Sequence, residues 1–132
     1  RDRSPSRGLG DVYKRQTMLE KGIHVSGSSD APVESFDPML AIHCAVTSTN
    51  LQGEPEGGWM PDQRLTVQEA VELYTTGSAY TAYEEEYKGK LKEGYLADFI
   101  VLSDDIFSID EKEILSVKVE KTFLGGEEVY SC

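Results

Sequence analysis

The chain has 132 residues, of which 39% are hydrophobic and 28% charged, values that exclude a disordered polymer and suit one folded segment of ordinary size. Its formal net charge of -11 excludes nucleic acid and anionic membrane surfaces as partners, because both attract lysine and arginine. Apolar runs, as at Phe99 to Leu102, are far shorter than the ~20 residues of a membrane-spanning helix. The two cysteines, Cys44 and Cys132, show neither a disulfide framework nor metal-ligand spacing.

The first sixteen residues, Arg1 to Gln16, differ in composition from the rest. They carry five basic and two acidic residues, a net charge of +3, whereas the remaining eight basic and 22 acidic residues give -14. One interpretation is a flexible basic tail. The other, which we favour, is that GLGDVYKRQ resembles translated adapter sequence and is not native. In both cases we expect residues 1–16 to form a non-native or disordered tail that packs against nothing and takes no part in the fold.

Helical and β patterns alternate after this tail. Thr17–Lys21 is typical of the last turn of a helix, and Ile23–Ser26 is a predicted short strand followed by small residues and Asp30. A helix is predicted over Pro38–Val46, because Asp37 suits the N-cap and proline suits the first helical position. The order of helix, strand and helix favours an α/β fold with parallel strands.

The middle of the chain contains a long loop and two predicted helices. The loop over residues 47–64 is rich in Gly and Pro, and connections of this length are usually functional or disordered. Thr66 and Glu69 then have the spacing of a capping box, which predicts a helix start with an apolar face behind it. Gly77 interrupts the pattern, and a second short helix is predicted over Ser78–Glu86.

The pattern becomes β from Lys88 onward. Gly94 suits a turn that needs a positive φ, and Gly125–Gly126 suits a two-residue hairpin turn. The strand predicted over Ala97–Ser103 is almost continuously apolar, which predicts burial on both faces. The strands are predicted over Lys88–Leu91, Ala97–Ser103, Ser116–Leu124 and Glu127–Tyr130. We therefore expect a small sheet attached to an α/β body.

Three stretches between Thr17 and Tyr130 resemble the carboxy-terminal part of the amidohydrolase superfamily, in particular its amidohydrolase-3 branch. They are GSSDAPV at Gly27–Val33, RLTVQEAVELYTTGSAYTAYEEEYKGKLKEGYLADFIVL at Arg64–Leu102, and VEKTFLGGEEVY at Val119–Tyr130. The resemblance implies the α/β fold of a metal-dependent hydrolase, a (β/α)₈ TIM barrel with a small β-sandwich domain. Residues 17–88 would supply the last strand and helices of the barrel, and residues 89–132 the carboxy-terminal strands of the sandwich. Because such a barrel needs ~250 residues, we expect a fragment that is inactive alone.

Asp30 is the residue that the resemblance singles out as both catalytic group and metal ligand. It follows a predicted strand, and barrel enzymes place catalytic residues at that end of their strands. A carboxylate beside an attacking water can accept its proton and deliver it to a departing amine. From the residues alone, Asp30 also suits an N-cap or an Asx turn after a strand.

Three other residues suit structural roles better than chemical ones. His24, on the same strand face as Asp30, is expected to be a packed interior histidine rather than a ligand. His43, within the predicted Pro38–Val46 helix, is expected to be structural. Asp98 matches the family pattern as a turn or strand-entry residue.

The resemblance implies a hydrolase of C–N bonds other than peptide bonds, acting on an amide or N-acyl small molecule. The implied cofactor is one or two divalent metal ions, most often zinc, with further ligands upstream. A small-molecule substrate is the expected partner, without nucleic acid or membrane, and the parent is expected in the cytoplasm. Two alternatives stay open: a superfamily member that acts on a cyclic amide or as a deaminase, and a non-enzymatic α/β binding module.

Overall fold

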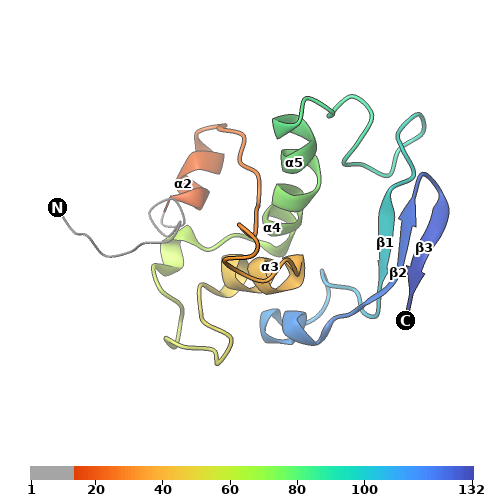
Figure 1. Cartoon of the computed structure of the whole chain (residues 1–132). Helices are drawn as coiled ribbons and strands as arrows, with labels where there is room; N and C mark the ends of the chain where they lie inside the picture. The colour runs from red at the N-terminus through yellow and green to blue at the C-terminus, as the bar shows by residue number, and fades with distance from the viewer. Residues whose placement is uncertain (1–13) are drawn as a thin grey trace.

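Helices occupy the first part of the chain and one small sheet the last (Figure 1). The structure is a computed structural model, and it describes residues 14–132. The helices are α2 (Arg15–Glu20), α3 (Pro38–Thr47), α4 (Val67–Tyr74) and α5 (Thr76–Thr81), with 3₁₀ turns η1 (Pro61–Gln63) and η2 (Glu111–Ser116). The strands are β1 (Phe99–Leu102), β2 (Val119–Leu124) and β3 (Glu127–Ser131). No helix in this part of the chain is long and apolar enough to cross a membrane.

Both predicted helix starts are confirmed. The Asp37 side chain accepts a hydrogen bond from the Met39 backbone N–H at 2.9 Å, and Pro38 occupies the first turn of α3. At α4, Thr66 and Glu69 form a complete capping box, in which each side chain accepts from the other residue's backbone N–H. These bonds occupy amide groups that have no partner within a helix, so the local sequence determines where both helices begin.

The core lies on one face of α3. The side chains of Ile42 and Val46 are buried there, and Ile114 of η2 is fully buried in the same cluster. The other buried members of the cluster are Met39, Ala45, Leu65, Ala70, Leu73, Ile106 and Val117. Helix α3 therefore contacts both α4 and η2, and η2 connects the sheet to the helical part.

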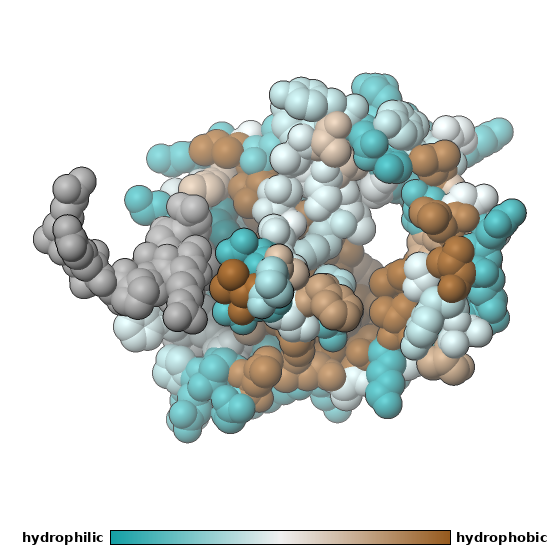
Figure 2. Space-filling model, viewed as in Figure 1, coloured by the Kyte–Doolittle hydropathy of each residue, from teal (hydrophilic) through white to brown (hydrophobic). Residues whose placement is uncertain are grey.

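The sheet is antiparallel, in the order β1-β2-β3, and the predicted hairpin at Gly125–Gly126 is confirmed. Phe99 and Phe123 face one another across β1 and β2, with ring centroids 4.5 Å apart. The predicted burial of the apolar β1 run is wrong, since Ile100 and Val101 are exposed. Figure 2 shows apolar side chains over the sheet, and Leu124 of β2 and Val129 of β3 are exposed as well.

Two predicted strands are not formed among residues 14–132. Ile23–Ser26 and Lys88–Leu91 are irregular, and every ladder in this range is antiparallel, so the parallel strands expected of the α/β pattern are missing here. A strand needs a neighbour to satisfy its backbone groups, and a β-rich sequence does not supply one. The second short helix, α5, covers Thr76–Thr81 and not Ser78–Glu86.

The predicted tail boundary after Gln16 is also wrong. Arg15 and Gln16 are the first residues of α2, and the Gln16 amide donates to the Glu69 carboxylate at 3.5 Å. Because both side chains are polar, the hydrophobic pattern of the sequence did not predict a helix here. Helix α2 includes these residues because Gln16 contacts Glu69 of α4. Residues 1–13 of that segment, including Val12 and Tyr13, lie outside the described residues.

Asp98 has the structural role expected of it. Its carboxylate accepts a hydrogen bond from the Gly125 backbone N–H at 2.7 Å, which joins the entry of β1 to the hairpin between β2 and β3.

We predict that Asp98→Ala lowers the free energy of unfolding by about 1 kcal/mol, because the turn amide loses its acceptor. Urea denaturation of the dilute 132-residue chain measures this change. Asp104→Ala, at another exposed loop carboxylate, is the control and should change it by less than about 0.5 kcal/mol; equal losses would contradict the assignment.

Candidate functional site

The candidate site is built on the segment from Ile23 to Asp30, which runs from α2 toward α3. Gly22, with φ +70°, ends α2, and the Ile23 N–H donates to the Met18 carbonyl at 3.0 Å. Further along, the Gly27 N–H donates to the Leu73 carbonyl at 2.9 Å. Contacts to two helices therefore hold this irregular segment before it reaches Asp30.

Asp30 itself lies in a tight turn. Its φ is +52°, in the left-handed region that only a few residue types, Asp among them, adopt readily. Its backbone N–H donates to the Ser28 hydroxyl at 3.2 Å, and its carbonyl accepts from the Val33 N–H at 2.9 Å. The carboxylate is exposed and accepts no hydrogen bond from residues 14–132, so it is available for chemistry.

The described residues do not by themselves fit the metal that the resemblance implies. Within residues 14–132, no three His, Cys, Asp or Glu side chains lie together as a metal site would require. Both cysteines are free thiols. Asp30 offers one carboxylate, which is fewer ligands than any metal site in an enzyme uses. The structure therefore gives Asp30 no complete set of metal ligands within residues 14–132.

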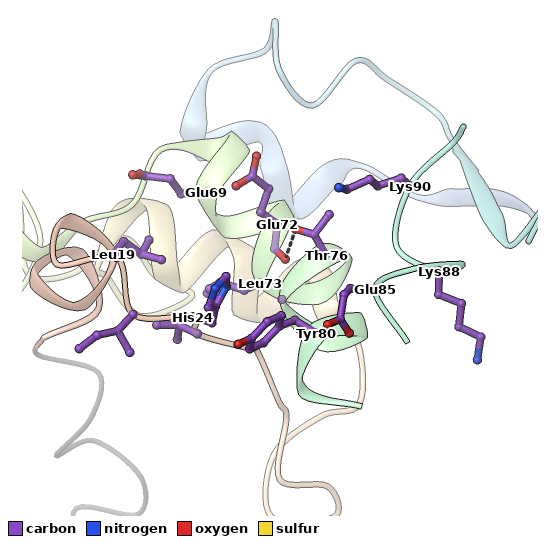
Figure 3. Close-up of a pocket in the computed structure, with 14 residues that line it drawn as sticks. Leu19, His24, Glu69, Glu72, Leu73, Thr76, Tyr80, Glu85, Lys88 and Lys90 are labelled. Atoms are coloured by element: carbon purple, nitrogen blue, oxygen red, sulfur yellow. Dashed lines mark hydrogen bonds between the residues drawn. The ribbon is translucent and has the colours of Figure 1, made fainter. Parts of the chain in front are cut away.

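A hollow of ≈ 570 Å³ lies beside the first half of the segment (Figure 3). Its walls come from α2, Gly22 and the start of the segment, α4, α5 and the chain that follows α5, and they include Glu72, Tyr80 and Glu85. The prediction that His24 is an interior residue is wrong in this structure, because its exposed ring stacks on Tyr80 with centroids 3.8 Å apart and an interplanar angle of 18°. Asp30 does not line this hollow.

Charged side chains surround one end of this hollow. The Oε2 atom of Glu85 is buried and has no hydrogen-bond partner in the described part of the chain. Lys88 donates to Glu84 at 3.0 Å, which raises the pKa of the Lys88 amine and lowers the pKa of the Glu84 carboxyl. Both side chains are about one-third exposed, and a surface ion pair of this kind contributes little to stability.

His43 is buried within α3, in agreement with its expected structural role. The Thr47 hydroxyl donates to the His43 backbone carbonyl at 2.8 Å and lies 3.5 Å from the ring Nε2. The ring Nδ1 has no partner among the described residues. His43 lies at the wall of a second hollow, of ≈ 750 Å³, which Asp30 does not line either.

Sequence reasoning missed two aromatic residues that shape the site. The Tyr74 ring lies against the backbone at Gly27, and Tyr80 stacks on His24. Burial raises the pKa of the Tyr74 hydroxyl, while the nearby Arg15 guanidinium acts to lower it. Both tyrosines lie in helices that the sequence predicts. An apolar pattern indicates that a helix face is buried, but it does not indicate which distant segment that face contacts.

The chain belongs to the amidohydrolase family, because the Amidohydrolase family model matches residues 4–130. The match begins inside the segment that sequence analysis excluded from the fold. A protein of Bacillus subtilis strain 168 that is named as an amidohydrolase, YtcJ, is 39% identical over 129 residues, which are 98% of this chain and 24% of that protein.

Two further relatives are informative. The N-substituted formamide deformylase of Arthrobacter pascens is 28% identical over 115 residues, 87% of this chain and 21% of the enzyme. The crystal structure of an amidohydrolase from Thermotoga maritima MSB8 superimposes with a TM-score of 0.63 at 17% identity, covering 92% of this chain and 26% of that one, which shows a shared fold. The chain thus spans about a quarter of the length of the relatives it matches.

Glu69 connects the helices around the site and makes their stability depend on pH. Burial acts to raise the pKa of its carboxyl, but hydrogen bonds from Thr66 and Gln16 together lower it below its usual 4.5. A lowered folded pKa means that this stabilisation is present above about pH 4.5 and is lost as the pH falls through the folded pKa.

We predict that Glu69→Gln removes this acid-sensitive part of the stability. The free energy of unfolding of the variant should fall less than that of the native chain between about pH 5 and pH 3, because glutamine has no proton to gain. Urea denaturation across this range measures the difference. Glu93→Gln, in the exposed turn at Lys92–Tyr95, is the matched control, and an identical acid response of native chain and Glu69→Gln would show the prediction to be wrong.

Proposed function

We propose that the chain is the carboxy-terminal part of a metal-dependent amidohydrolase that cleaves C–N bonds other than peptide bonds in an amide or N-acyl small molecule. The observation that carries this proposal is the family match over residues 4–130, within which Asp30 presents an exposed carboxylate in a left-handed turn. The name of the Arthrobacter relative, an N-substituted formamide deformylase, supports an N-acyl substrate.

The proposed parent fold is a (β/α)₈ barrel with a small β-sandwich domain. Residues 17–88 would contribute the last barrel strand and its helices, and the sheet of residues 89–132 would be one layer of the sandwich. The exposed apolar residues over the sheet support a covering layer in the parent, since single apolar residues on a surface are ordinary but a continuous group marks an interface. A small-molecule substrate and a cytoplasmic location belong to the same proposal.

The role we propose for Asp30 is proton transfer. Its exposed carboxylate would hold a proton taken from the attacking water and return it to the amine nitrogen as the C–N bond breaks. A divalent metal, most often zinc, would supply Lewis acidity, with Asp30 as one ligand and the others from parts of the parent other than residues 14–132.

We predict that the isolated 132-residue chain has no hydrolase activity with or without added zinc, because residues 14–132 bring no three candidate ligands together. The measurement is hydrolysis of N-acyl amino acids and N-substituted formamides by the purified chain. We also expect self-association that grows with concentration, given its exposed apolar residues. Metal-dependent turnover that survives repurification would refute the fragment assignment, and a chain that stays monomeric at high concentration would favour the binding-module alternative.

In the complete parent enzyme, we predict that Asp30→Asn lowers kcat by at least ~10²-fold, because asparagine keeps the size but not the proton acceptor. The melting temperature should change little, since the carboxylate makes no hydrogen bond within the described residues. Asp98→Ala is the reciprocal control: it should lower the melting temperature and leave kcat nearly unchanged. Kinetics, melting curves and metal content of both variants test this, and an Asp30→Asn enzyme with most of its kcat would leave Asp30 as a turn residue only.

A further inference from the structure

Gly27 has no side chain because of what lies beside it and not because of its backbone conformation. Its φ lies outside the left-handed range, so any residue could adopt its backbone conformation. A Cβ atom on Gly27, however, would lie 2.5 Å from Cε2 and 2.6 Å from Cζ of the Tyr74 ring. Gly22 and Gly94 show the opposite situation, with positive φ and no atom within 4 Å of an added Cβ.

A second glycine makes a similar contact from the other direction. A Cβ on Gly77, in the first turn of α5, would collide with the backbone carbonyl oxygen of Val25. The break between α4 and α5 at Thr75 therefore lies directly on the segment that leads to Asp30. The hydrogen bond from Gly27 to the Leu73 carbonyl fixes the same contact in register.

The Tyr74 ring is itself held on several sides. It is half-buried and packs on the hydrophobic cluster around α3. Arg15 and Cys44 lie close enough to affect the pKa of its hydroxyl. A held ring against a bare backbone is a stiff contact, because glycine has no rotamer to change and the packing around Tyr74 restricts the rotamers of its ring. Asp30 follows Gly27 by three residues, about 10 Å of extended chain, so a shift at Gly27 is passed on to Asp30.

We propose that Tyr74 and Gly27 are positioning residues for Asp30: the ring of Tyr74, packed on the bare backbone of Gly27, sets the place of the Asp30 carboxylate. This inference rests on the proposed function, since it assigns a role that matters only if Asp30 acts on substrate. Displacement of a catalytic group by about 1 Å can cost ~10²-fold in rate, so the contact need not touch the substrate to affect turnover.

The test uses the complete enzyme that carries these residues. Gly27→Ala adds a methyl group where the ring lies and should lower kcat by ~10- to 100-fold with a smaller change in KM. Tyr74→Leu removes the two ring atoms nearest to Gly27 and should lower kcat less, because it loosens the segment without displacing it. The double variant should recover most of the kcat lost in Gly27→Ala, since the new methyl group occupies the vacated space.

Two controls separate positioning from general damage. Gly22→Asn changes the glycine just before the segment, where an added Cβ has no neighbour within 4 Å, and asparagine tolerates positive φ, so kcat should stay unchanged. Gly77→Ala meets a backbone oxygen rather than the ring, so Tyr74→Leu should not rescue it. Melting curves show whether each variant folds, and if Gly27→Ala does not, the Tyr74→Leu variant carries the test.

The decisive measurement combines these changes with Asp30→Asn. If Gly27 acts through Asp30, Gly27→Ala lowers kcat in the native enzyme but adds little to the loss in the Asp30→Asn enzyme. Additive losses, or a Gly27→Ala enzyme with native kcat beside an impaired Asp30→Asn enzyme, overturn the inference and leave the proposed function intact. An Asp30→Asn enzyme with native kcat overturns the proposed function, and the inference with it.

Discussion

Burial of one face of α3 is the interaction on which the rest of the described structure depends. Helix α4 packs on this face from one side and η2 from another, and Val46 and Ile114 are the most completely buried large side chains. The loop that leaves α3 returns to it, because the Leu65 N–H donates to the Ala45 carbonyl at 3.0 Å and the Arg64 Nε to the Val46 carbonyl at 2.6 Å. Arg64 also pairs with Glu111 at the start of η2. One helix thereby fixes the relation of the other helices to the sheet.

The same arrangement determines where Asp30 can lie. The turn that holds Asp30 is confined at one end by the contact between Gly27 and α4, and at the other by the capped start of α3 at Asp37. Because α4 packs on α3, the two ends of this connection are held by a single core. The carboxylate is therefore exposed on a short connection between fixed points, an arrangement that suits a residue whose chemistry depends on orientation.

Membership of the amidohydrolase family explains features that a self-contained domain of this size would not need. Large apolar side chains stay exposed over the sheet (Figure 2), and the segment from Ile23 to Ser29 has no ladder partner within residues 14–132. The relatives that match are about four times as long as this chain. Under the proposed function, both exposed features are surfaces at which the described residues meet the remainder of the parent.

The sequence by itself determined the local structure wherever neighbouring residues satisfy one another. Asp37 with Pro38, the Thr66–Glu69 capping box and the Gly125–Gly126 turn were all predicted, because their hydrogen bonds and φ angles depend on a few adjacent residues. The family and Asp30 as its candidate residue also came from local motifs.

Tertiary structure alone decided which β-like segments pair, where helix α2 begins, and that His24 stacks on Tyr80. It alone brought the Tyr74 ring onto Gly27, 47 positions away along the chain. A strand needs a neighbouring strand for its hydrogen bonds, and an aromatic ring needs other residues to pack against. In both cases the partners are distant in sequence, and their approach depends on how α3 and α4 pack.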